Sequence, residues 1–207
     1  MCDIIFNISD ALFHFTDLEH VFPLNIVQAL NPDFYHNHPY VDSGIPLTYY
    51  RLESKQDRLI QYFKESRKAY DSGKVALKNA FGEAAVKALS DVANEIDQFF
   101  DFWISQVHKN LSFCASRGRN IIVSSGHLST CFAKLIAFGF SNHIASQDIY
   151  TLSSPASLLQ VMSRLGDCSQ VLVIGRIFDS SLSQRFPQVR LVREEDVVAL
   201  CVDSSLQ

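Results

Sequence analysis

From Gly118 onward, short apolar runs rich in β-branched residues alternate with amphipathic segments long enough to form helices. The apolar runs lie at 120–125, 148–152, 171–175 and 189–192. The segments with helical length and spacing lie at 128–140, 154–166 and 194–206. Parallel strands produce this alternation, because a crossover of about a dozen residues must return the chain to the same end of the sheet. The second half of the chain is therefore predicted to be α/β, with a parallel sheet flanked by helices.

The first half of the chain has no strand pattern and is predicted to be helical. Residues 1–30 are typical of helix with loops, and Asp10 is a candidate N-cap. Residues 31–48 contain three prolines, one glycine and two asparagines, which predicts a loop. From Tyr49 to about Ser116 apolar residues recur at helical spacing, with breaks expected near Ser72 and Gly82. The predicted organisation is a helical region at 1–117 and an α/β core at 118–207.

Composition excludes several classes of function. The net charge is −4 and no Lys/Arg cluster occurs, so direct binding to nucleic acid is not expected. No apolar run approaches the roughly 18 residues of a membrane span, and the N-terminus lacks the features of a signal peptide. The five cysteines are scattered and form no CxxC pair, which indicates reduced thiols. A nuclear or cytoplasmic protein that does not bind membranes is expected.

Two of the predicted strands end in polar residues. "NIIVSSGH" ends with Ser124, Ser125 and His127, and "VLVIGRIFD" ends with Arg176 and Asp179. Ligands of open parallel sheets bind outside the carboxyl ends of the strands. These residues are therefore predicted to form the walls of one site, although the pattern alone does not name a reaction.

Five stretches together point to a known family. They are "MCDIIFNISDALFHFTDLE", "DFWISQVHKNLSFCASRGRNIIVSSGHLSTCFAKLIAFGF", "DIYTLSSPASLLQVMSRLG", "VLVIGRIFDSS" and "VREEDVVAL". In this order they resemble five parts of the Eyes absent domain. These are the helical cap, the segment from a Trp-bearing helix into the second strand and its helix, the next strand and helix, the fourth-strand signature, and the closing strand with the C-terminal helix. That family is a branch of the haloacid dehalogenase superfamily. The resemblance implies a Rossmannoid parallel sheet flanked by helices, with a helical cap in the N-terminal half.

Members of the family act as Mg²⁺-dependent tyrosine phosphatases and as transcriptional coactivators that dock on Six-type homeodomain proteins. Ser124 matches the family's phosphate-binding threonine, and Ser125 follows it. Arg176 stands where the family has a metal-binding aspartate, and Asp179 falls near the acidic residue that follows. No lysine occurs between residues 150 and 164, where one would neutralise transition-state charge. A guanidinium repels Mg²⁺, so no cofactor is expected.

The family's first strand, which ends in Asp-x-Asp, allows two alignments. In the first, residues 3–8 belong to the cap helix and the chain begins after the point where the Asp-x-Asp strand would lie. In the second, residues 3–8 form a decayed first strand, with Asn7 in place of the nucleophile and Ser9 in place of the general acid. Neither side chain is a carboxylate, so neither alignment supports an aspartyl-phosphate.

The resemblance therefore implies an Eyes-absent-like pseudophosphatase that serves as a protein-binding module and as a coactivator with a homeodomain partner. The alternative is a Mg²⁺-dependent protein tyrosine phosphatase with a divergent active site, in which Asp179 would bind the metal. The family's docking surface includes the C-terminal helix. The residues expected to bind the partner are Val197, Val198, Leu200, Cys201 and Asp203.

Overall fold

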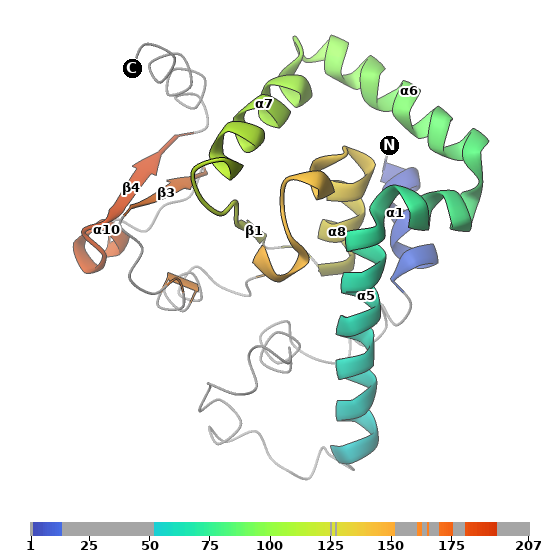
Figure 1. The fold of residues 1–207 in the computed structure, drawn as a ribbon, viewed down its shortest axis with the longest axis horizontal. Helices are drawn as coiled ribbons and strands as arrows, with labels where there is room; N and C mark the ends of the chain where they lie inside the picture. Colours follow the sequence, from blue (N-terminus) through green and yellow to red (C-terminus); the bar gives the residue numbers. More distant parts are fainter. Residues whose placement is uncertain are drawn as a thin grey trace. The chain divides into compact units, whose positions relative to one another are not determined.

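The computed structural model of the protein describes residues 2–13, 52–124, 126, 128–151, 161–162, 165, 170–175 and 181–193 (Figure 1). At 52–63, 151, 181 and 183 it describes the backbone alone. The chain separates into two compact units, 1–153 and 154–207. Both units combine helices with short parallel strands, so the protein is mixed α/β and mostly helical. The predicted division at 117/118 marks the place where strands begin in the chain, whereas the compact units divide after Ser153.

The first unit contains five described helices, and two of the breaks in their sequence lie at glycines. They are α1 (Cys2–Leu12), α5 (Leu52–Phe81), α6 (Glu83–Phe99), α7 (Trp103–Ala115) and α8 (Leu128–Ala137). Gly73 lies inside α5 with φ 28°, where the helix kinks, and Gly82 separates α5 from α6 with φ 81°. Glycine adopts positive φ at little steric cost, and both breaks lie where the sequence predicts them.

The N-terminal segment is a helix. The alternative in which residues 3–8 form a strand is wrong, because this segment lies within α1. Ile5 and Ile8 are both buried in the core of the first unit, at the spacing of a helix face. Asp10 lies in the last turn of α1 and is exposed, so its expected role as an N-cap is wrong as well.

The four predicted strands are present, and they pair two by two. In the first unit, β1 (Ile122–Ser124) runs parallel to β2 (Ile149–Thr151), and α8 lies between them in sequence. In the second unit, β3 (Val171–Ile174) runs parallel to β4 (Val189–Val192), and the short helix α10 (Ser181–Arg185) connects them. The helices expected at 154–166 and 194–206 fall largely outside the described residues, as does the expected loop at 31–48.

The core of the first unit forms around α8, in which every residue except Thr130 and Lys134 is buried. The ring of Phe132 lies against Tyr70 of α5 at 4.7 Å between centroids, and against Phe13, which follows α1, at 5.5 Å. The Tyr70 hydroxyl donates a hydrogen bond of 3.0 Å to the carbonyl of Ile144. One aromatic cluster therefore holds three helices together. In the second unit, Met162, Leu182 and Val189 form a smaller core.

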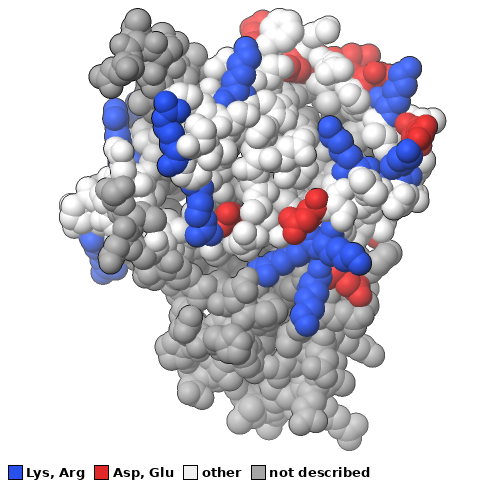
Figure 2. Space-filling model, viewed as in Figure 1, with Lys and Arg blue, Asp and Glu red and all other residues white. Residues whose placement is uncertain are grey.

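On the face drawn in Figure 2, charged residues of both signs are interspersed. In the view of Figure 2, lysine and arginine side chains lie among acidic and uncharged ones rather than in a continuous basic band. None of the described helices is both long enough and apolar enough to cross a membrane.

Candidate functional site

The structure describes only part of the site expected at the strand ends. Ser124 ends β1 and is paired in register with Thr151, which ends β2, so the carboxyl ends of the two strands lie side by side. The Ser124 Oγ accepts a hydrogen bond of 3.1 Å from the backbone N–H of Gly126. Ser125, His127, Arg176 and Asp179 lie outside the described residues.

The described contacts of Ser124 lie within the fold. Ser124 hydrogen-bonds the thiol of Cys131, a buried residue of α8. Burial raises the pKa of Cys131 to about 11, against the smaller lowering effects of Ser124 and Lys134. The thiol is therefore protonated at neutral pH and is a poor nucleophile. The Ser124 hydroxyl by itself does not fit Mg²⁺, which prefers several oxygen ligands with carboxylates among them.

The two buried carboxylates among the described residues of the first unit are engaged elsewhere. Asp148 comes directly before β2, at the end of the strand away from Thr151, and pairs with Arg119. Asp97, near the end of α6, accepts hydrogen bonds from the start of α7. Among the residues that the structure describes, no three His, Cys, Asp or Glu side chains lie close enough together to share a metal ion.

Asn7 and Ser9 do not meet Ser124 at a strand end, because both belong to α1. Ser9 is buried, and Asn7 is exposed on another face of the helix. Asn7 instead lines an apolar pocket that the sequence did not predict.

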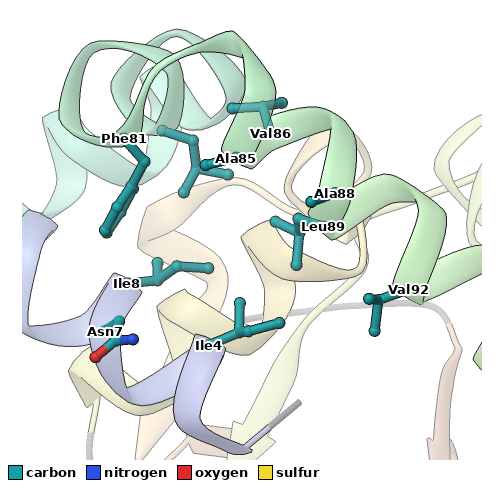
Figure 3. Close-up of a pocket in the computed structure, with 10 residues that line it drawn as sticks. Ile4, Asn7, Ile8, Phe81, Ala85, Val86, Ala88, Leu89 and Val92 are labelled. Atoms are coloured by element: carbon teal, nitrogen blue, oxygen red, sulfur yellow. The ribbon is translucent and has the colours of Figure 1, made fainter.

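This pocket has a volume of about 260 Å³ and lies between α1, the end of α5 and α6 (Figure 3). Its lining residues are nearly all apolar: Ile4, Asn7, Ile8, Leu77, Phe81, Ala85, Val86, Ala88, Leu89 and Val92. Figure 3 shows Phe81 and Leu89 directed toward the residues of α1 across the pocket. We call this feature the α1–α6 groove.

The α1–α6 groove has a closed floor and an open rim. Ile8, Leu77 and Leu89 are buried and form the floor. Ala85 and Ala88 are exposed on the α6 side. With Leu89 and Val92 these alanines follow the spacing i, i+3, i+4, i+7, so an apolar stripe two turns long faces the groove. The apolar spacing of this stripe can be read from the sequence, but the same spacing is equally typical of a helix packed into a core.

A second feature that the sequence did not indicate is a pair of coupled histidines. The Nε2 of His108 lies 2.8 Å from the carbonyl oxygen of Phe138, so this nitrogen carries a proton and donates. In a neutral His108 ring, Nδ1 then accepts from the Nε2–H of His143 at 3.0 Å. Burial, and then the charge of His108, lower the pKa of His143. The pair fastens α7 to the segment after α8 and is satisfied within the fold.

No protein-family model matches the chain, and no curated protein matches it. The resemblance to the Eyes absent domain therefore rests on the order and content of the motifs in the chain, and it stays a prediction.

Proposed function

We propose that the protein is a binding module of the Eyes absent type, with a haloacid dehalogenase-like fold and without phosphatase chemistry. The observation that carries the proposal is the α1–α6 groove, an apolar pocket open at its rim. Exposed apolar pockets in proteins commonly mark interaction sites. Its volume of about 260 Å³ is below the range of about 300–1,000 Å³ typical of small-molecule sites. A few side chains of a protein partner fit such a space better than a cofactor does.

The proposed occupant is an amphipathic helix of a partner protein. The stripe on α6 is two turns long, and a helix presents apolar anchors at the same i, i+3, i+4 spacing. Ala85 and Ala88 are small, so the backbone of a partner helix can approach α6 closely. Asn7, the one polar residue among those that line the pocket, offers an amide that can hydrogen-bond the partner.

The identities of the strand-end residues support a module without catalysis. Asn7 and Ser9 carry no carboxylate and lie in a helix. Ser124, at the end of β1, is a hydroxyl and cannot form an aspartyl-phosphate. Arg176, in place of a metal-binding acid, adds a cation where Mg²⁺ would need an anion.

A Six-type homeodomain protein is the partner class that the resemblance favours, which would place the protein in the nucleus or the cytoplasm. The expected contact residues Val197, Val198, Leu200, Cys201 and Asp203 lie outside the described residues. Their role stays a prediction, separate from that of the α1–α6 groove.

Photo-crosslinking tests the groove directly. Replacing Phe81, which lies at the rim, with benzoylphenylalanine is expected to yield a covalent protein adduct in native extract, identified by mass spectrometry. Adding Ala88→Arg should abolish the adduct, because a guanidinium would be desolvated in an apolar contact. The readout is the adduct yield for one identified protein, followed by binding of that purified protein.

The chain offers matched controls for this experiment. Phe6 is 65% exposed on α1 and does not line the groove, so benzoylphenylalanine at that position should not give the adduct. Ala84→Arg changes an exposed alanine of α6 beside the groove and should leave the adduct intact. Equal adduct yields at positions 81 and 6, or an adduct insensitive to Ala88→Arg, would exclude the groove as the binding site.

The purified protein is expected to show no turnover of p-nitrophenyl phosphate or phosphotyrosine peptides with Mg²⁺, because it lacks a carboxylate nucleophile. Typical enzymes have turnover numbers of about 1–10³ s⁻¹, so a turnover number below roughly 0.01 s⁻¹ counts as inactive here. The turnover number is measured by colorimetric detection of released phosphate, with and without EDTA. Turnover above that limit that EDTA abolishes would favour the phosphatase alternative.

A further inference from the structure

Four aromatic side chains stand out from the corner between α6 and α7. Phe99, Phe100, Phe102 and Trp103, here called the aromatic corner, are between 59% and 80% exposed. The rings of Phe99 and Phe100 meet edge to face at 5.0 Å between centroids. Trp103 is the only tryptophan in the chain. Large aromatic groups clustered on a surface are typical of the central contacts of protein interfaces.

The backbone holds the aromatic corner in a fixed and unusual conformation. Asp101 and Phe102 have φ of 49° and 61°, a region that non-glycine residues adopt rarely and at a cost in free energy. Asp97, buried one turn earlier, secures the corner: its carbonyl accepts a hydrogen bond of 2.7 Å from the N–H of Phe102. Its carboxylate accepts from the N–H groups of Ile104 at 2.7 Å and Ser105 at 3.1 Å. The aromatic side chains are therefore presented in a preorganised arrangement.

The chain segment that carries the aromatic corner is acidic. No lysine or arginine occurs between Lys87 and Lys109, while Asp91, Glu95 and Asp101 are exposed in that interval. Figure 2 shows acidic side chains at the top of the view among uncharged ones, with a basic side chain beside them. A partner for this surface must pack against exposed aromatic rings and carry positive charge that complements the carboxylates.

We infer that the aromatic corner is a docking site for an arginine-rich segment of a partner protein. A guanidinium stacks on the face of tryptophan or phenylalanine and pairs with carboxylates in its plane. The chain already uses this contact within itself, since the guanidinium carbon of Arg117 lies 3.7 Å from the ring centroid of Phe113. At the aromatic corner, Asp101 lies between Phe100 and Phe102 in the chain, and no lysine or arginine occurs between residues 87 and 109.

Charge favours an arginine-rich segment over three other binding partners: a membrane surface, a nucleic acid and a second copy of the chain. Anionic membrane surfaces and nucleic acids would repel the carboxylates, because both bind through basic residues. A second copy of the chain would bring two acidic corners together, and like charges opposed across an interface are unfavourable. The inference does not rest on the α1–α6 groove, which is lined by other residues.

Trp103 supplies a fluorescence signal specific to the aromatic corner. The whole chain is titrated with a synthetic peptide of alternating arginine and leucine, and the tryptophan emission is recorded. A saturable change is expected, which weakens as salt is raised because exposed charges are screened. A peptide with lysine in place of arginine should bind more weakly. A peptide with glutamate in place of arginine should leave the tryptophan emission unchanged.

Variants then assign the binding to named side chains. Phe99→Ala should weaken binding about tenfold, as loss of a central aromatic contact does. Asp101→Asn, which keeps a residue tolerant of positive φ, should weaken it about two- to fivefold. Phe6→Ala, which changes another exposed phenylalanine on α1, should leave binding unchanged. Circular dichroism confirms that each variant is folded.

Several results would overturn the inference. These are an unchanged Trp103 emission at saturating peptide, equal responses to the arginine and glutamate peptides, or wild-type binding by Phe99→Ala. A blue shift of Trp103 on phosphatidylserine vesicles without a response to the peptide would assign the aromatic corner to membranes. Concentration-dependent dimerisation in sedimentation, lost in Phe99→Ala, would assign it to a second copy. This site can also be tested separately from the proposed function. If Phe99→Ala loses peptide binding but still gives the crosslinked adduct at the α1–α6 groove, the two sites are independent.

Discussion

Replacing Phe132 by alanine is expected to lower the free energy of unfolding by about 3–5 kcal/mol, the range for a buried phenylalanine. Phe132 is almost fully buried in α8 and contacts Tyr70 and Phe13. These contacts join α8 to α5 and to the residue after α1, so the cavity would lie where three elements meet. Urea unfolding followed by far-ultraviolet circular dichroism measures the change.

The control for this substitution is Phe6→Ala, which removes the same side chain from an exposed position of α1. Its effect should be within about 0.5 kcal/mol of zero, as for most surface substitutions. Equal midpoints for the two variants would mean that the aromatic cluster does not hold the helices together.

The second large effect is expected at Asp97, which holds the start of α7. Its carboxylate receives N–H groups from Ile104 and Ser105 as well as the Ser105 hydroxyl. Asp97→Ala leaves these donors without their acceptor, and Ile104 is buried where water cannot replace it. The melting temperature should fall by about 2–8 °C, as expected for loss of a helix cap in a protein of this size.

The pH dependence of stability should reveal the same carboxylate. Burial raises the pKa of Asp97, but the hydrogen bonds from Ser105 and Ile104 and the charge of His108 outweigh it, and the pKa is lowered overall. A lowered pKa in the folded state means that the ionised form contributes stability above the unfolded pKa of about 3.9. That contribution is lost as the pH falls through the folded value, so the loss lies below about pH 4.

Melting curves between pH 7 and pH 2 test this. The wild type should lose more stability on acidification than Asp97→Asn, which has no charge to lose. Asp91→Asn, an exposed carboxylate of the same helix, is the matched control and should follow the wild type. Identical acid profiles for the wild type and Asp97→Asn would refute the role assigned to this carboxylate.

The sequence alone determined the elements whose patterns are local. The four strands, the change from helices to strands after Gly118 and the breaks near Ser72 and Gly82 follow from apolar periodicity and glycine. These features depend on neighbours in the chain, which a sequence displays directly. At residues 3–8 the local pattern was ambiguous, because "DIIFNI" fits a strand as well as a helix. Burial of Ile5 and Ile8 on one helical face resolved it.

Only the tertiary structure decided where surfaces form. The α1–α6 groove joins Ile4 and Ile8 to Leu89 and Val92, residues more than 80 positions apart, and no local pattern relates them. The aromatic corner is visible in the sequence as "FFDFW", yet a run of aromatic residues ordinarily predicts a buried core. Its exposure follows from the positive φ of Asp101 and Phe102 and from the hydrogen bonds to Asp97. These turn α7 away from α6 so that Ile104 packs inside while the four rings remain in solvent.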